Sequence, residues 1–177
     1  SYHKMNTPPL SPEERQALSK RLNAVQGYLE LAMPIEAWNE LEQIAPPQKG
    51  IFEVLKVRVD VCRALEGWEL MAELATELSK AEPKEFKHTD DLAHALRRLK
   101  GIEEADVILS RQLANDPDNA FVIYKLGCLE FLRFGMDVAR PTLQRAFTLD
   151  SSLKGVALED PDLRGFWEGM CASSAED

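Results

Sequence analysis

Residues 115–150, NDPDNAFVIYKLGCLEFLRFGMDVARPTLQRAFTLD, contain the pattern that decides the fold. A cluster of turn-forming residues opens this stretch, and Asn119 stands where it would cap a following helix. Apolar residues then recur at helical spacing, as Leu126 and Leu129 do. Gly135 interrupts this pattern, and a second helical pattern follows it. The stretch therefore predicts two helices joined by a tight turn.

The turn glycine of this stretch recurs at a fixed interval along the chain. Gly67, Gly101 and Gly135 are separated by steps of 34 residues (101 − 67 and 135 − 101), and Pro83 and Pro117 are 34 residues apart as well. Several other positions follow the same interval: Ala37, Met71, Ala105 and Ala139; Leu41, Ala75, Leu109 and Leu143; and Arg63 with Arg97. Because these columns share one register, they indicate an internal structural repeat.

The apolar spacing between these markers predicts helices in four successive pairs. We expect them at 12–31 with 34–45, 49–65 with 67–80, 86–99 with 102–114, and 119–133 with 136–148. The residues Ser11-Pro12-Glu13-Glu14 resemble a capping box with proline at the first helical position, which supports the first start. The fifth helix has two candidate starts, one just after Pro83 and one at Thr89 with that residue as its cap.

A further helix is expected after the fourth pair. Asp160-Pro161-Asp162 is a favourable helix start, and Leu163, Phe166 and Trp167 would then share one face. The end of a solenoid needs a cover for its last apolar face, so we interpret this segment as a short capping helix. The alternative is a docking helix for a partner, since exposed aromatic residues often mark interfaces.

The period and the residues at these positions resemble the tetratricopeptide repeat (TPR) family. The resemblance covers roughly residues 19 to 151 and is strongest in the stretch quoted above, where Leu126 and Gly127 take the Leu-Gly slots and Ala139 and Ala146 take the two small slots. Departures occur at the glycine slot, which holds Val25, Val59 and Ala93, and at the proline slot, which holds Lys49 and Ser151. The resemblance implies an all-α, right-handed solenoid of about four hairpins, with a concave groove lined by the first helix of each pair.

We expect three regions along the chain: a disordered N-terminal tail or tag remnant at 1–10, a single TPR-like solenoid domain at 11–170, and a disordered acidic tail at 171–177. At 177 residues the chain is long enough for one such domain with its own core. The cysteines Cys62, Cys128 and Cys171 form no CxxC pair, which argues against a disulfide framework or a zinc site and favours a reduced, cytoplasmic setting.

Composition and motifs narrow the function classes. The net charge of −9 disfavours nucleic acid as the main partner, and it equally disfavours an anionic membrane surface. No apolar run approaches the roughly 20 residues of a membrane span. The chain has no HExxH, P-loop, GxSxG or GxGxxG pattern. We therefore expect neither an enzyme nor a protein that needs a cofactor or a metal.

The groove implied by the resemblance holds the candidate binding residues. They are Lys56, Asp60, Arg63, Lys87, Asp90, His94, Arg97, Tyr124, Cys128 and Phe131. Arg63 and Arg97 would stack on successive helices and could grip a carboxylate, and Tyr124 and Phe131 could receive an apolar anchor. The alternative is that the charges neutralise one another, Arg63 with Asp60 and Arg97 with Asp90.

These residues predict a non-enzymatic scaffold that binds a peptide or helix of a partner protein in the groove. A self-associating structural subunit, or a secretion-type chaperone built from the same repeats, remains the alternative. Some TPR proteins bind the C-terminal carboxylate of chaperones through groove asparagines. Here Gln26, Asp60, His94 and Cys128 stand in that slot, so this specific activity is not supported.

Overall fold

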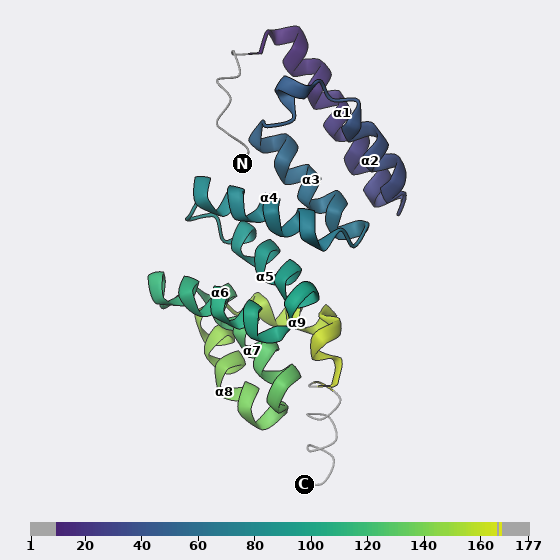
Figure 1. Ribbon diagram of the computed structural model, residues 1–177. Helices are drawn as coiled ribbons and strands as arrows, with labels where there is room; N and C mark the ends of the chain where they lie inside the picture. Colours follow the sequence, from purple (N-terminus) through teal and green to yellow (C-terminus); the bar gives the residue numbers. More distant parts are fainter. Residues whose placement is uncertain (1–9, 166, 168–177) are drawn as a thin grey trace. The chain divides into compact units, whose positions relative to one another are not determined.

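The computed structural model describes residues 10–165 and 167, and its regular elements are all helical (Figure 1). The expected tails fall outside the described residues except for Leu10, which packs against the first core cluster. The contacts divide the chain after Lys100 into two compact units, here called unit 1 and unit 2. The expected single domain over 11–170 stays a prediction, and each unit is described by itself.

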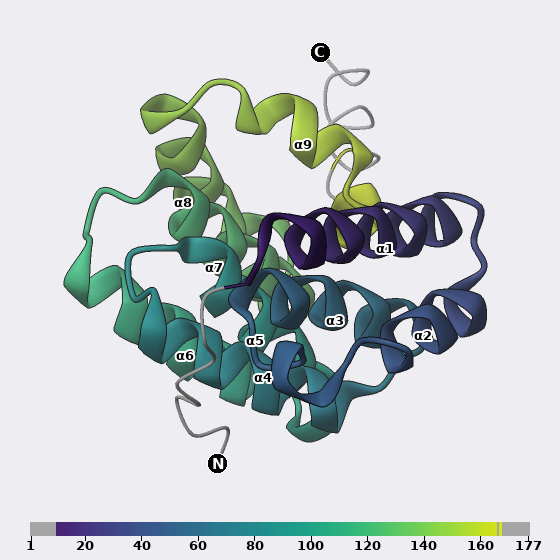
Figure 2. The same cartoon turned by 90° about the horizontal axis from the view of Figure 1, so that it is seen from above.

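Unit 1 consists of two helix hairpins and a further helix. Its elements are α1 (Pro12–Glu30), α2 (Pro34–Glu42), the short 3-10 helix η1 (Pro46–Gln48), α3 (Phe52–Ala64), α4 (Trp68–Ala81) and α5 (Phe86–Lys100). Helix α1 packs on both α2 and α3, and α4 packs on both α3 and α5. Figure 2 shows α1 and α3 next to each other, so the first helices of successive hairpins are neighbours.

Unit 2 contains the last complete hairpin and the C-terminal elements. They are α6 (Ile102–Asn115), α7 (Ala120–Phe134), α8 (Met136–Leu149), α9 (Leu153–Glu159) and the 3-10 helix η2 (Pro161–Leu163). Helix α7 packs along α8 and also against α6, while η2 returns to α7. The core of unit 2 is therefore built around α7.

The eight helices expected from the repeat are all present, with ends within three residues of the predicted ones. Helix α5 begins at Phe86, so the start soon after Pro83 is confirmed and the start at Thr89 is not. The capping box is formed, since Ser11 Oγ accepts from the Glu14 backbone N–H at 3.1 Å and the Glu14 carboxylate accepts from the Ser11 N–H at 2.8 Å. Asn119 caps α7 through the Val122 N–H at 3.1 Å. The sequence did not reveal η1 or α9.

The columns of the 34-residue grid become the buried contacts between helices. Three sets of equivalent positions are all buried: Val25, Val59, Ala93 and Gly127; Ala37, Met71, Ala105 and Ala139; and Leu41, Ala75, Leu109 and Leu143. The tightest crossing joins the first set to the third. An added Cβ at Gly127 would lie 2.8 Å from Cγ and 2.7 Å from Cδ2 of Leu143. Helices α7 and α8 can approach this closely only because Gly127 has no side chain.

The turn positions follow the grid, but the strained residue does not. The N-cap of the second helix is Met33, Gly67, Gly101 and Gly135 in successive hairpins. In the last two hairpins this glycine itself has positive φ, at 111° and 87°. In the first two, the residue before it is left-handed, with φ of 54° at Ala32 and 56° at Glu66. The glycine at 67 is therefore not required by its own backbone angle.

The Gly127–Leu143 crossing yields a stability prediction. Gly127→Ala is expected to lower the free energy of unfolding of unit 2 by about 1–2 kcal/mol, because overpacking against the fully buried Leu143 outweighs the gain in helix propensity. Gly155→Ala is the matched control. Its Cβ meets nothing within 4 Å, so it should be neutral or stabilising by up to about 1 kcal/mol. Urea melts that show Gly127→Ala as stable as wild type would contradict the close crossing.

The left-handed alanine yields a second prediction. Ala32→Gly is expected to raise the free energy of unfolding of unit 1 by about 0.5–1 kcal/mol, because glycine avoids most of the left-handed penalty at φ 54°. Ala24→Gly, at an exposed position inside α1, should instead lower it by a similar amount. Opposite shifts in the thermal midpoints of the two variants test this. Shifts of the same sign would mean that the turn is not formed as described.

Candidate functional site

The groove positions expected from the resemblance lie on the first helices of their pairs. Lys56, Asp60 and Arg63 lie on α3. The positions on α5 are Lys87, Asp90, His94 and Arg97, and those on α7 are Tyr124, Cys128 and Phe131. The structure brings the α3 and α5 sets together within unit 1, and it places the α7 set in the core of unit 2.

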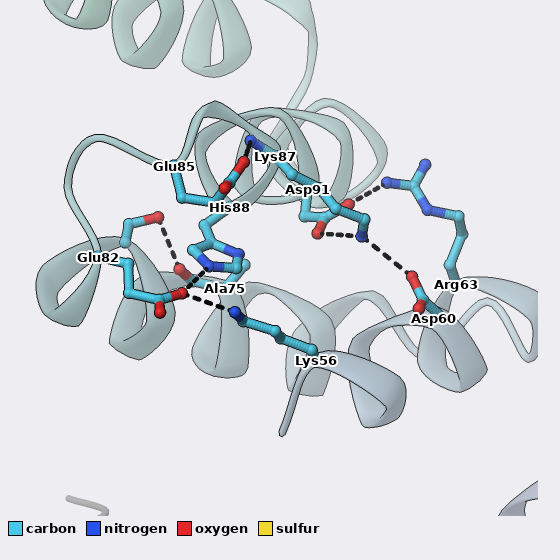
Figure 3. Close-up of polar contacts among 10 residues, drawn as sticks. Lys56, Asp60, Arg63, Ala75, Glu82, Glu85, Lys87, His88 and Asp91 are labelled. Atoms are coloured by element: carbon cyan, nitrogen blue, oxygen red, sulfur yellow. Dashed lines mark hydrogen bonds and ion pairs between the residues drawn. The ribbon is translucent and has the colours of Figure 1, made fainter. Parts of the chain in front are cut away.

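A buried carboxylate, Asp91, connects α3 to α5. It is 2% exposed, and its two oxygens accept from different cations. Arg63 of α3 donates to Oδ1 at 2.6 Å, and Lys87 of α5 donates to Oδ2 at 2.9 Å. Lys87 also reaches Asp60 of α3 at 3.0 Å, which closes a chain of alternating charges across the two helices (Figure 3). These pairs hold neighbouring first helices in register.

A second polar cluster lies at the other end of the same face (Figure 3). Glu82, which ends α4, accepts from Lys56 of α3 at 2.8 Å and from Nε2 of His88 of α5 at 2.8 Å. Because a carboxylate only accepts, Nε2 of His88 must carry the proton in this contact. The imidazole is 1% exposed, which puts it out of reach of a substrate. His88 therefore serves as a structural link among three helices.

These contacts shift two pKa values in opposite directions. The hydrogen bonds from Lys56 and then His88 hold the pKa of Glu82 below its usual value. For Lys87, burial opposes the charged form, but the hydrogen bonds and negative charges of Asp91 and Asp60 outweigh burial and raise its pKa. Both shifts favour the charged forms, so the ion pairs contribute to stability at neutral pH.

The charges on α3 and α5 neutralise one another, but with partners other than those expected. Arg63 pairs with Asp91 rather than with Asp60, and Asp60 pairs with Lys87. The residues meet between two helices because their side chains face a neighbouring helix, a proximity that spacing along one helix does not reveal. Three of the four cations expected to grip a carboxylate, Lys56, Arg63 and Lys87, already contact carboxylates of this chain.

An aromatic and cationic cluster lies where α4 begins. The ring of His94 lies 5.3 Å from that of Trp68, in a tilted arrangement. The guanidinium of Arg98 lies over the Trp68 ring at 5.1 Å, a cation–π contact. His94 thus has an aromatic neighbour that the sequence did not reveal, because Trp68 belongs to a different helix. The cluster joins the end of α5 to the start of α4.

An open cavity of about 450 Å³ lies beside α1 and the start of α3. Its lining is aliphatic in the middle and polar at the edges: Leu10, Leu18, Leu22 and Ile51, with Arg15, Ser19, Asn23 and Glu53. The leucines at 18 and 22 are one helical turn apart, a signal that was present in the sequence but pointed equally to core packing. Leu10 and Ile51 join them only through the fold. This cavity is the main surface feature that the sequence did not predict.

The candidate positions on α7 are covered by the chain itself. Tyr124 is fully buried, and its hydroxyl donates to Oδ2 of Asp160 at 2.6 Å. The same oxygen lies 3.9 Å from Sγ of Cys128. Burial, followed by the charge of Asp160, raises the pKa of the Cys128 thiol to about 12. Tyr124 therefore does not present its ring on an open groove in this structure.

The covering segment is residues 153–165, here called the C-terminal arm. It comprises α9, η2 and the two residues after η2. Leu153, Ala157 and Leu163 are buried in the same core cluster as Tyr124, with Phe131 packed against that cluster. Beyond the arm, Trp167 stacks on Phe147 of α8. The expected cap at the end of the repeat thus includes a 3-10 helix, which Asp160 caps, together with the unpredicted α9; Phe166 falls outside the described residues.

Two further searches return nothing in the described part of the chain. Among these residues, no three His, Cys, Asp or Glu side chains gather where they could hold a metal ion. Each described helix is too short or too polar to cross a bilayer.

The Glu82 cluster predicts an acid-dependent loss of stability in unit 1. Because the pKa of Glu82 is lower in the folded chain than its model value of 4.5, its contribution is complete above that pH and is lost as the pH falls through the folded pKa. Glu82→Gln should lower the urea midpoint of unit 1 at pH 7, and the difference from wild type should shrink by pH 3. Glu73→Gln, at an exposed position on α4, is the control and should change little at either pH. A Glu82→Gln deficit that persists unchanged at pH 3 would refute the charge-based account.

The fold can now be compared with known proteins. No family model and no curated protein matches the chain. Among solved structures, one described as "MamA RS-1 ArsTM double mutant" is similar, with a TM-score of 0.61 and 19% sequence identity, covering 96% of this chain and 99% of that chain. MamA is a TPR-containing protein. The chain therefore has a TPR-like, all-helical repeat fold, as the 34-residue period predicted.

Proposed function

We propose that this chain is a non-enzymatic scaffold that binds a peptide or helix of a partner protein along the face formed by α1, α3 and α5. One observation carries the proposal: the open cavity beside α1 and α3 presents Leu18, Leu22 and Ile51 at its centre. A cavity of this size accommodates one or two aliphatic side chains, the type of anchor on which peptide recognition commonly depends.

The polar surroundings of the cavity support the same proposal. Arg15, Ser19, Asn23 and Glu53 form its edge, and such a polar rim around an apolar centre is typical of protein-binding surfaces. The groove residues of α3 and α5 continue this face: Lys56, Asp60, Arg63, Lys87, Asp90, His94 and Arg97. Since Lys56, Arg63 and Lys87 are already paired, we propose that the charges fix the helices and select among partners, while the cavity supplies most of the affinity.

A second candidate function, self-association, is favoured by a different observation. Leu31 and Ile35, which flank the turn between α1 and α2, are 70% and 64% exposed, with Met33 between them at 37%. Contiguous exposed apolar side chains of this kind often mark interfaces between proteins. A dimer or a chaperone-like assembly formed through this turn would leave the cavity free.

Filling the cavity tests the first function. Ser19→Trp places an indole at the cavity edge, and Lys20→Trp adds the same group at the adjacent exposed position outside the lining. Affinity capture with mass spectrometry should recover partners with wild type and with Lys20→Trp, whereas Ser19→Trp should reduce their yield at least tenfold. Equal thermal midpoints of the two variants serve as the folding control.

The outcome also separates the two functions. Equal recovery with Ser19→Trp and Lys20→Trp would rule out the cavity as the binding surface. Sedimentation velocity over a concentration series then tests self-association, with Leu31→Ser/Ile35→Ser as the variant. A dimer that persists at low micromolar concentration and is lost in this variant would favour the structural role instead.

A further inference from the structure

The C-terminal arm contacts α7 through one carboxylate and one leucine. Asp160 accepts the hydrogen bond of the Tyr124 hydroxyl at 2.6 Å, and Leu163 is fully buried in the cluster that contains Tyr124 and Cys128. Asp160 and Leu163 are three residues apart across η2, and side chains at i and i+3 of a 3-10 helix lie on the same side. The 3-10 turn therefore presents an acid and an aliphatic group together to one helix face.

The same repeat position is open elsewhere in this chain. Phe121 and Tyr124 of α7 are separated from Ser19 and Leu22 of α1 by 102 residues, which is three repeat lengths (124 − 22). Ser19 and Leu22 line the open cavity of unit 1. Tyr124, by contrast, lies under the arm. The repeat thus provides the same helix face twice, once open and once filled, and the filled copy shows which chemistry the face accepts.

The arm is attached to unit 2 by few groups. Helix α9 has seven residues and buries only Leu153 and Ala157, while Val156 and Leu158 remain 44% and 66% exposed. Short elements with few buried side chains open at a lower free-energy cost than the helices beneath them. The arm can therefore leave α7 while the α7–α8 hairpin stays folded.

We propose that the α7 face around Tyr124 and Cys128 is a second binding surface, which takes a partner segment with a carboxylate followed three residues later by leucine or a similar aliphatic residue. The C-terminal arm is its built-in competitor. A partner gains access when the arm leaves, and it then replaces both the hydrogen bond of Asp160 and the buried side chain of Leu163. This surface differs from the cavity of unit 1 and carries its own test.

Alkylation of Cys128 reports whether the arm opens. The full chain with Cys171→Ser is treated with iodoacetamide, and peptide mass spectrometry gives separate rates for Cys128 and for Cys62, which is buried in unit 1 and serves as the internal reference. Asp160→Asn should raise the Cys128 rate about tenfold relative to Cys62, because it weakens the bond to Tyr124 while asparagine can still cap η2. Glu159→Gln is the matched control at the adjacent exposed position and should change the rate less than twofold.

Tyr124→Phe is the stricter variant. The Asp160 charge itself raises the pKa of Cys128, so Asp160→Asn changes the reactivity of the thiol as well as its access. Tyr124→Phe removes only the hydroxyl and should still speed Cys128 alkylation severalfold. If the Cys128 rate stays fixed relative to Cys62 in both variants, the arm opens only when the protein unfolds, and the proposal fails.

A peptide supplied in trans tests the binding surface itself. The probe is ALEDPDLRG, the sequence of residues 157–165, added to the Asp160→Asn protein. Saturable slowing of Cys128 alkylation by this peptide, and not by a peptide with the equivalent of Asp160→Asn and Leu163→Ala, is the expected result. No slowing at millimolar peptide, with the arm shown to be open, would overturn the proposal. Neither result depends on the cavity variants Ser19→Trp and Lys20→Trp, so failure here is distinguishable from failure of the proposed function.

Discussion

The fold depends on how closely the two helices of a hairpin can approach. At the tightest crossing, Gly127 faces Leu143 with no room for even a Cβ atom. The equivalent positions in the other hairpins hold Val25, Val59 and Ala93, all buried. Because small or medium side chains recur at this position, a 34-residue unit can close in the same way each time. The repeat is thus a packing constraint first and a sequence pattern second.

Two kinds of contact join successive units of this repeat, and they separate structure from recognition. In unit 1 the buried Asp91 ties α3 to α5 through Arg63 and Lys87, which consumes charges that would otherwise face a ligand. In unit 2 the helix face around Tyr124 is consumed by the chain's own arm. The surface with unfilled apolar space in unit 1 is the cavity beside α1. Recognition is therefore proposed where the structure has left a repeat position open.

The helices could be predicted well, and the partners of their side chains could not. The apolar period and the caps Ser11 and Asn119 are local signals, so element positions followed from them to within three residues. The charge pairs were assigned along single helices, whereas Arg63 and Asp91 meet between helices that are 28 residues apart in the chain. The groove position of Tyr124 was recognised from the repeat, but nothing local indicated that Asp160 would return to it.

The sequence by itself determined the helical class, the 34-residue unit and the positions of the turns, because each rests on the residue types within one or two helical turns. Only the tertiary structure decided that Gly67 needs no left-handed backbone while Ala32 and Glu66 adopt one. It also decided that a cavity opens beside Leu22 and that the arm covers Tyr124. These features depend on distances between segments far apart in the chain, and such distances are set by how whole helices pack.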